Sequence, residues 1–386
     1  MSEWVSKKIG DIANLYQGLA INAKTKHLLV TESSLPLLRI KDLLEGTKEQ
    51  FVDPKLAPLQ CVVEPNELVM TRTGQVGYVF MGKSGVLHNN CFKITVTDPE
   101  VDTRFLYWHF NSNAQRDYLT TIAAGSVQPD LNHKVFKDYD VLLPPLTEQK
   151  AIASVLSSLD DKIDLLHRQN KTLEAMAETL FRQWFIEEAK EDWEEKTIGD
   201  IFTIKGGGTP STKEPSYWDG GIAWTSPRDL STAKSLYMFS TERTITELGL
   251  TKVSSGLLPV GTLLMSSRAP IGYLALTDIE VAVNQGYIAI LKHDLYSNEF
   301  MYLWCKANME LIKNSGNGSV FQEISKASFR ELPFVCPPEP LLKEFNDRCI
   351  NWFSKIKLNT KQIQTLENLR DTLLPKLMSG EVRVQY

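Results

Sequence analysis

Two long stretches of the chain carry apolar side chains at alternating spacings of four and three residues. The first runs from Thr147 to about Glu188 and contains neither glycine nor proline. Its apolar positions are Ile152, Leu156, Leu159, Ile163, Leu166, Leu173, Ala177, Leu180 and Trp184. This spacing is typical of a helix that packs along a coiled-coil seam. It predicts a helix about 60 Å long at 1.5 Å per residue, with Thr147 after Pro145 as its N-cap.

The second stretch runs from about Pro340 to Met378 and ends at Gly380, a residue that commonly terminates helices. Its seam positions are Phe345, Trp352, Ile356, Ile363, Leu366 and Leu373. Because two unpartnered seams would be exposed to water, we expect the two helices to pack on each other in antiparallel orientation.

Each seam also contains one asparagine, Asn170 in the first helix and Asn359 in the second. Two interpretations stay open. Each asparagine marks a frayed or hydrated point of the seam, or the two fix the register of the pair, as buried polar seam residues can.

The sequences that precede the long helices resemble each other at a separation of about 190 residues, too long for a solenoid repeat. The matched residues, in the same order in both copies, are Trp4 with Trp193, Lys41 with Arg228, Met70 with Met265, Gly77 with Gly272, Asn89 with Asn284, Phe92 with Tyr287, Phe105 with Phe300, Gly125 with Gly318, and Pro144 with Pro337. Both copies contain short β-type runs broken by Gly, Asn, Pro and Ser. Helical stretches are expected at 105–121 and 300–314.

These patterns predict an α+β protein with two homologous mixed α/β domains, at residues 1–145 and 191–338. A long spacer helix follows each domain, at residues 146–190 and 339–386. The helices would join the domains and keep them apart in a pseudo-twofold arrangement.

Composition narrows the class of protein. Apolar residues make up 42% of the chain and charged residues 23%, which is typical of a globular protein. No apolar run is long enough to span a membrane, and the N-terminus lacks the pattern of a signal peptide. Five scattered cysteines indicate neither a disulfide framework nor a zinc site. We therefore expect a cytoplasmic protein, and its net charge of −5 would confine any DNA binding to local basic surfaces.

One segment fits the phosphate-loop pattern GxxxxGK[ST]: Gly77 to Ser84. That loop must follow a strand and open a helix. Here the middle residues are bulky β-formers and another strand-like run follows Ser84, so we predict a hairpin turn at Gly82–Gly85 and no nucleotide site.

A second apparent motif resembles a nuclease pattern, in which the carboxylates of Asp130 and Glu148 and the amine of Lys150 would have to converge on Mg²⁺. The second copy replaces the corresponding residues, and Glu148 opens the long helix. No other motif indicates catalysis, and none indicates adenine methylation by this chain.

Over its whole length the chain resembles the specificity (S) subunits of type I restriction-modification enzymes. The resemblance lies in Pro144, Pro145, Glu148 and Gln149 at the entry to the first helix, in the segment 173–185, and in the segment 373–382. In the second domain it includes the segments 207–211, 267–272 and 284–286. The first domain departs from it, with Gln17, Gly18 and Leu19 at the first of these places.

The resemblance implies a non-catalytic subunit that recognises double-stranded DNA. Each domain would read one half of an asymmetric bipartite target. The helices would set the half-site spacing and dock two methyltransferase (M) subunits, and restriction-motor (R) subunits would join the complex. S-adenosylmethionine, ATP and Mg²⁺ would be bound by those partners, with no cofactor and no metal in this chain.

Side chains that hydrogen-bond base edges or phosphates, and that fall in turns, are the candidate DNA contacts. In the first domain they are Thr71, Arg72, Thr73, Gln75, Asn89, Asn90, Ser126, Gln128, Asn132 and Lys134. In the second they are Thr209, Ser211, Lys213, Ser226, Arg228, Ser267, Arg268, Asn284, Gln285, Ser319, Gln322 and Lys326. Arg72 and Arg268 lie in turns of matching position and are the strongest candidates, although each polar residue here could also serve only its own turn.

Two alternatives remain. A self-contained nucleotidase or nuclease would use the motifs above, but the second copy lacks their lysines and carboxylates. A coiled-coil adaptor that binds only proteins would suit the acidic first helix. Its acidic residues are Asp160, Asp161, Asp164, Glu174, Glu178, Glu187 and Glu188.

Overall fold

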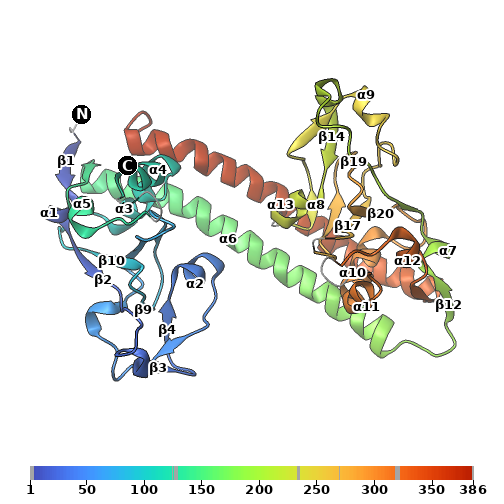
Figure 1. Cartoon of the computed structure of the whole chain (residues 1–386), viewed down its shortest axis with the longest axis horizontal. Coiled ribbons are helices and arrows are strands. Elements are labelled where there is room, and N and C mark those ends of the chain that lie inside the picture. Colours follow the sequence, from blue (N-terminus) through green and yellow to red (C-terminus); the bar gives the residue numbers. More distant parts are fainter. Residues whose placement is uncertain are drawn as a thin grey trace. The chain divides into compact units, whose positions relative to one another are not determined.

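The structure, a computed structural model, describes residues 4–123, 125, 129–232, 235–268, 270–317 and 322–384. The chain divides into two compact units, Met1–Lys162 with Leu366–Tyr386 (unit 1) and Ile163–Thr365 (unit 2). Each unit combines a mixed α/β head with parts of both long helices (Figure 1). Head 1 comprises residues 4–143, and head 2 comprises residues 194–336.

Head 1 contains two main sheets. Its elements are β1 (Val5–Lys8), α1 (Ile9–Ile12), β2 (Ala13–Gln17), β3 (Leu29–Val30), β4 (Leu35–Leu38), α2 (Ile40–Glu45), β5 (Phe51–Val52), β6 (Val62–Val63), β7 (Leu68–Thr71), β8 (Val79–Phe80), β9 (Gly85–Leu87), β10 (Cys91–Val96), α3 (Thr103–Phe110), α4 (Asn113–Ile122), α5 (His133–Lys137) and β11 (Asp140–Leu143), with short 3₁₀ turns at Lys26–Leu28 and Leu59–Cys61. One sheet has the strand order β2-β10-β7-β8, the other has the order β3-β5-β4-β9-β6, and β1 pairs with β11.

Head 2 repeats this plan. Its elements are β12 (Glu194–Thr197), α7 (Ile198–Ile201), β13 (Ile204–Lys205), β14 (Trp218–Thr225), α8 (Pro227–Thr232), β15 (Tyr237–Met238), β16 (Arg243–Ile245), α9 (Glu247–Leu250), β17 (Leu263–Ser266), β18 (Leu274–Thr277), β19 (Ala282–Val283), β20 (Tyr287–Ile290), α10 (Asn298–Ala307), α11 (Met309–Asn314), α12 (Lys326–Arg330) and β21 (Pro333–Cys336), with a 3₁₀ turn at Pro215–Tyr217. Its central sheet has the order β13-β20-β17-β18-β15, a second sheet has the order β16-β14-β19, and β12 pairs with β21.

The central strands of both heads have buried side chains throughout, as in β7 and β17. Such runs favour strands covered on both faces. In both heads a parallel pair joins the second sheet: Leu38 lies opposite Leu87 on β4 and β9, and Thr225 lies opposite Val283 on β14 and β19. The heads therefore share a parallel strand pair that joins strands distant from each other in the sequence.

Strand register and backbone hydrogen bonds correct two of the sequence matches. Met70 lies opposite Phe92 and Met265 lies opposite Ile288, so Phe92 corresponds to Ile288 and its match with Tyr287 is wrong by one residue.

The other correction comes from the parallel pairs of β4 with β9 and of β14 with β19. The residues after these parallel pairs bond alike, because His88 N donates to Leu38 O at 3.1 Å and Asn284 N donates to Thr225 O at 2.9 Å. Asn284 therefore occupies the position of His88, and the match of Asn89 with Asn284 is wrong by one residue. Hydrogen-bond register, which residue identity does not reveal, decides the equivalence.

Two local predictions are also wrong. Gly82–Gly85 is not a hairpin turn, since β8 pairs with β7 whereas β9 pairs with β4 and β6 in the other sheet. The expected helical stretches are each broken into two helices. In head 1 the first helix ends at Phe110 with Asn111 as its C-cap, and Ser112 caps the second by accepting a hydrogen bond from Gln115 N at 3.3 Å.

The two long helices are α6 (Leu146–Arg182), followed by a π-helical turn at Gln183–Glu187, and α13 (Glu339–Ser379). Gly380 follows α13 in the left-handed conformation with φ +74°. The prediction that Thr147 caps the first helix is wrong. The helix already begins at Leu146, so Thr147 lies within its first turn, and Pro145 O accepts the amide protons of Glu148 and Gln149.

In unit 1 the start of α6 and the end of α13 complete the core of head 1, through Ile152, Leu156, Leu374 and Leu377. Arg370 Nη1 donates to Asp160 Oδ1 at 2.6 Å and joins the two helices. Of the other predicted seam residues in this unit, Leu159, Leu366 and Leu373 are partly buried.

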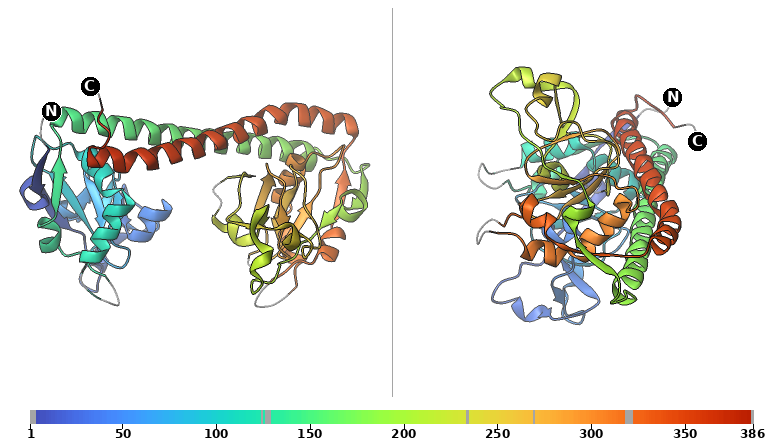
Figure 2. Two further views of the ribbon diagram at one scale, coloured as in Figure 1. Left: turned by 90° about the horizontal axis from the view of Figure 1, so that it is seen from above. Right: turned by 90° about the vertical axis from the view of Figure 1, so that its right-hand side faces the viewer.

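In unit 2, α6 and α13 run side by side along one flank of head 2 (Figure 2). Asn170 contacts Asn359, while Trp184, in the π-helical turn after α6, contacts Phe345, earlier in α13, so the two segments are antiparallel. The seam residues Ile163, Leu166, Ile356 and Ile363 are buried, and Leu173, Leu180 and Trp352 are partly buried.

Several acidic residues of α6 are engaged within their own unit. Lys306 binds both Glu174 and Glu178 in unit 2, and Arg370 binds Asp160 in unit 1. The acidic face is therefore weaker support for a protein partner than the sequence suggests.

Asn359 lies at the centre of a polar contact in the unit 2 seam. It is 0% exposed, and its Nδ2 donates to Asn170 Oδ1 at 2.9 Å. Asn170 Nδ2 donates in turn to Thr360 Oγ1 at 3.4 Å. Within the described residues Asn359 Oδ1 has no partner. The complete burial of Asn359 does not fit a frayed position.

We predict that Asn170→Leu with Asn359→Leu raises the free energy of unfolding by about 1–3 kcal/mol, because apolar packing replaces an imperfectly paired buried polar group. We also expect a less uniform register. Denaturant unfolding measures the first effect, and pulsed electron spin resonance between labels at the exposed positions Lys171 and Leu358 measures the second. Gln364→Leu, at an exposed position of α13, is the control. Lower stability with an unchanged, narrow distance distribution would contradict the expectation.

Candidate nucleic-acid interface

In each head, loops gather at one edge of the central sheet. In head 1 this edge is formed by the end of β2, the end of β7 and the start of β10, which are antiparallel neighbours. The loop before α5 joins them. Arg72 N donates to Asn90 O at 2.9 Å, and Leu131 N donates to Arg72 O at 2.9 Å. Three loops that are distant in sequence are thereby held in register.

Head 2 holds the equivalent loops by the same bonds. Ser267 N donates to Gly286 O at 2.8 Å, and Ile324 N donates to Ser267 O at 3.0 Å. These bonds correct the comparison of the two arginines, because Ser267 occupies the position of Arg72. Arg268 corresponds to Thr73, one residue further along the turn.

A buried hydroxyl shapes both turns. Thr71 Oγ1 accepts a hydrogen bond from Tyr78 N at 3.0 Å, and Ser266 Oγ accepts one from Tyr273 N at 2.8 Å. Thr71 is 0% exposed. This candidate therefore supports the turn and does not reach the surface.

Arg72 is held by side chains from two other loops. Its Nε donates to Asp130 Oδ1 at 2.9 Å, its Nη2 donates to Asp130 Oδ2 at 2.5 Å, and its Nη1 donates to Gln17 Oε1 at 2.6 Å. Thr73 Oγ1 donates to Asp130 Oδ1 at 2.8 Å. The Arg72 guanidinium holds the pKa of Asp130 below its usual range, so the carboxylate stays charged near neutral pH.

Head 2 carries a looser version of this arrangement beside an amide cluster. Arg268 Nη1 lies 3.9 Å from Glu323 Oε2. Thr209 Oγ1 donates to Gln285 Oε1 at 2.6 Å, and Asn284 Nδ2 lies 3.3 Å from Thr209 Oγ1. Arginine and amide side chains are the groups that read guanine and adenine edges.

Three consecutive glycines position Thr209. A Cβ at Gly207 would lie 1.7 Å from Val283 O, and one at Gly208 would lie 2.9 Å from Lys252 O, both of them backbone atoms. Gly18 has the same role in head 1, where a Cβ would lie 2.2 Å from His88 O. The backbone can approach the sheet edge this closely only without side chains.

The structure divides the predicted contacts by exposure. The exposed candidates are Gln75, Lys134, Thr209, Ser211, Lys213, Arg228, Gln285, Gln322 and Lys326. The partly buried candidates are Arg72, Thr73, Asn89, Asn90, Asn132, Ser226, Arg268 and Asn284. Thr71 and Ser267 are buried. Ser126, Gln128 and Ser319 lie outside the described residues.

Some candidates have a visible local function. Asn132 caps α5 by accepting a hydrogen bond from Val135 N at 3.0 Å. Asn284 Oδ1 accepts one from Gly286 N at 2.5 Å. Their amides are partly committed to the fold, which makes them weaker candidates for base contacts.

Sequence reasoning missed Gln17, whose side chain binds Arg72 and also donates to Asn89 O. It also missed the association of Asp130 and Glu323 with the two arginines. The sequence signal that could have identified Gln17 was its position, because Gln17 is the last residue of β2 and stands immediately before Gly18.

The apparent nuclease residues do not form a common site. Asp130 binds Arg72, whereas Glu148, which is 0% exposed, is paired by Arg383. In the described parts of the chain no group of three or more His, Cys, Asp or Glu side chains could hold a metal ion. No helix among those parts is both long and apolar enough to cross a membrane.

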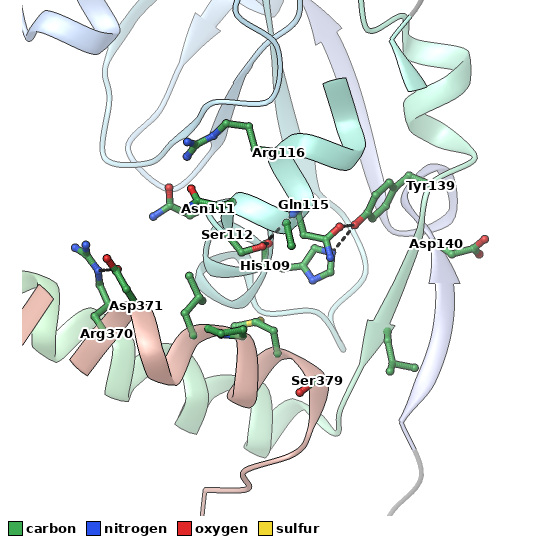
Figure 3. A pocket seen from close by; sticks show the side chains of 16 residues that line it. His109, Asn111, Ser112, Gln115, Arg116, Tyr139, Asp140, Arg370, Asp371 and Ser379 are labelled. Atoms are coloured by element: carbon green, nitrogen blue, oxygen red, sulfur yellow. Dashed lines mark hydrogen bonds and ion pairs between the residues drawn. The ribbon is translucent and has the colours of Figure 1, made fainter. Parts of the chain in front are cut away.

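A cavity of about 690 Å³ in unit 1 lies between the α3–α4 turn and the end of α13 (Figure 3). His109 Nε2 lies 2.8 Å from the Tyr139 hydroxyl, which donates to Gln115 Oε1. Burial lowers the pKa of His109 to about 4, so the ring is neutral near pH 7. We interpret this network as structural, because it joins α3 and α4 to the residue before β11.

The apparent phosphate loop has the wrong context, since β9 and not a helix follows Ser84. We predict that the chain does not bind ATP and that Lys83→Ala changes stability by less than about 0.5 kcal/mol, as for other surface substitutions. Calorimetric titration with ATP and denaturant unfolding check this. Saturable ATP binding that the variant loses would restore the nucleotide-site interpretation.

Two heads of common topology, each packed on segments of both long helices, define a duplicated two-domain protein. The sequence pattern described as the type I restriction modification DNA specificity domain matches residues 1–175 and 190–368. The chain therefore belongs to this family, and the family membership predicted from the resemblance is confirmed.

Relatives match over nearly the full chain. The type I restriction enzyme MjaIX specificity subunit of Methanocaldococcus jannaschii is 26% identical, covering 99% of this chain and 94% of its own. The HindI specificity subunit of Haemophilus influenzae is 20% identical, covering 99% of this chain and 100% of its own. The crystal structure of the type I S subunit from M. genitalium has a TM-score of 0.65 at 19% identity, covering 97% of this chain and 96% of that one. This likeness confirms the predicted fold class.

Proposed function

We propose that this chain is the non-catalytic, DNA-reading subunit of a cytoplasmic type I restriction-modification complex, and that each head reads one half of a bipartite target. The observation that carries the proposal is the duplicated sheet edge, which presents an arginine and amide side chains from loops fixed by matching backbone bonds. Such side chains distinguish bases by their hydrogen-bonding edges.

The two edges differ in the groups they offer, which supports an asymmetric target. Head 1 offers Arg72 beside Asp130 and Gln17, and head 2 offers Arg268 beside Thr209 and Gln285. Lysines and hydroxyl side chains around these groups would bind phosphates and orient each head on the duplex.

The long helices would set the distance between half-sites and dock two methyltransferase subunits, with restriction-motor subunits joining the complex. At 37 residues, α6 is about 55 Å long, whereas half-sites on one face of B-DNA lie about 34 Å apart or at a multiple of this distance. S-adenosylmethionine, ATP and Mg²⁺ would be bound by the partner subunits.

The first test of this function is methylome sequencing of cells that express the chain with its methyltransferase subunit. We expect adenine methylation at one asymmetric, interrupted sequence, because the two edges present different groups. Cells that express the methyltransferase subunit alone are the control. A complex that forms but adds no sequence-specific methylation would instead support a protein-binding adaptor.

The second test concerns Arg268. Arg268→Ala should weaken binding to the target duplex by about 1–3 kcal/mol and relax specificity at one position, if the guanidinium makes a bidentate guanine contact. Fluorescence anisotropy with matched and substituted duplexes measures both effects. Arg182→Ala, at the end of α6, removes the same charge away from the sheet edge. Equal affinity and specificity in wild type and Arg268→Ala would remove Arg268 from the interface.

A further inference from the structure

The contacts of Arg72 lead to an inference that rests on the proposed DNA-reading function. We infer that Asp130 is a positioning residue, which orients Arg72 so that head 1 reads a guanine with a preset guanidinium. Head 2 uses the related pair Arg268 and Glu323 in a less constrained form.

The geometry of Arg72 leaves a defined part of the side chain available. A guanidinium carries five N–H donors. Asp130 takes one from Nε and one from Nη2, and Gln17 takes one from Nη1. Among the described residues the remaining N–H of each terminal nitrogen has no partner. Two such donors match the O6 and N7 acceptors that guanine presents in the major groove.

The backbone fixes both members of the pair. Thr73 and Asp130 form an isolated β-bridge, and Leu131 N donates to Arg72 O at 2.9 Å. Thr73 Oγ1 also donates to Asp130 Oδ1 at 2.8 Å, so the carboxylate is held before any DNA arrives. A side chain ordered in advance loses less conformational entropy on binding.

Charge distinguishes base reading from phosphate binding. Phosphate attraction depends on uncompensated positive charge. The Asp130 carboxylate neutralises the Arg72 guanidinium, which weakens that attraction while it fixes the direction of the donors. A carboxylate beside Arg72 therefore favours recognition of a base edge over attraction to the DNA phosphates.

Head 2 has a related but less constrained pair, whose arginine lies one residue further along the turn than Arg72 does. The separation of Arg268 Nη1 and Glu323 Oε2 is 3.9 Å, and these side chains are 43% and 49% exposed. The side chains of Arg72 and Asp130 are 22% and 36% exposed. A β-bridge between Arg268 and Glu323 again sets the backbone. Each head thus pairs an arginine with an acid, but only head 1 holds both in a two-bond geometry.

The decisive variant is Asp130→Asn, which keeps the shape of the side chain but loses the charge and one acceptor. The full-length chain is incubated with a pool of randomised duplexes, and the bound fraction is sequenced. We expect discrimination at one base pair of the head 1 half-site to fall about tenfold. Preferences at the head 2 half-site should stay as in wild type. Affinity for non-target duplex should stay equal or rise, since a negative charge is removed.

Three further variants separate the alternatives. Asp130→Glu should recover part of the discrimination, and Glu323→Gln should reduce it less than threefold at the head 2 half-site. Asp138→Asn is the matched control, because Asp138 is exposed and pairs with Lys8 at 3.2 Å outside the cluster. It should behave as wild type.

Two results overturn the inference. One is discrimination by Asp130→Asn equal to that of wild type at every position. The other is an even loss of affinity across all sequences with a lowered melting temperature, which would make Asp130 a structural residue or Arg72 a phosphate contact. If the wild-type chain itself selects no sequence, the proposed function fails and the inference about Asp130 fails with it, whereas selection by the wild type that Asp130→Asn leaves unchanged overturns the inference alone.

Discussion

The packing of the two long helices into the heads is the constraint on which the rest of this structure depends. In unit 2, Phe181 of α6 and Phe345 of α13 belong to the same buried cluster as Phe300 and Phe334 of head 2. In unit 1, Leu156 and Leu374 join the core of head 1. Neither helix is an appended linker, because its apolar stripe is also part of a domain core. A change of helix register would therefore disturb a head as well as the seam.

Much of this architecture could be predicted from the sequence, because its signals are local or periodic. The seam spacing gave both long helices, and the ordered matches gave the duplication. The features that the sequence does not predict depend on pairing between residues that are distant in the chain. Nothing near Gly82 shows that β8 and β9 enter different sheets, and nothing near Arg72 shows that Asp130 will bind it. Residue identity also placed Arg72 and Arg268 in equivalent positions, whereas the hydrogen bonds of Ser267 show a shift of one residue.

The sequence predicts the residue types of the candidate site better than it predicts which of their side chains project from the sheet edge. Turn position and residue type selected residues that the structure gathers at one edge of the central sheet in each head. They could not separate side chains that project from it, such as Gln285, from those that build it, such as Thr71 and Asn132. The framework bonds are shared by the two heads while the projecting groups differ. A duplicated fold can in this way keep one geometry and offer two different chemical surfaces.

The composition of unit 1 also has a consequence for synthesis of the chain. Its core includes Leu374 and Leu377, and Arg383 pairs with Glu148, which has no exposed surface. The N-terminal head therefore cannot complete its interior until residues 374–383 have left the ribosome. During translation Ile152 and Leu156 lack part of their packing, while all of unit 2 has already been made. A chain whose synthesis stopped before Leu374 would lack part of the core of unit 1, although all residues of unit 2 would be present.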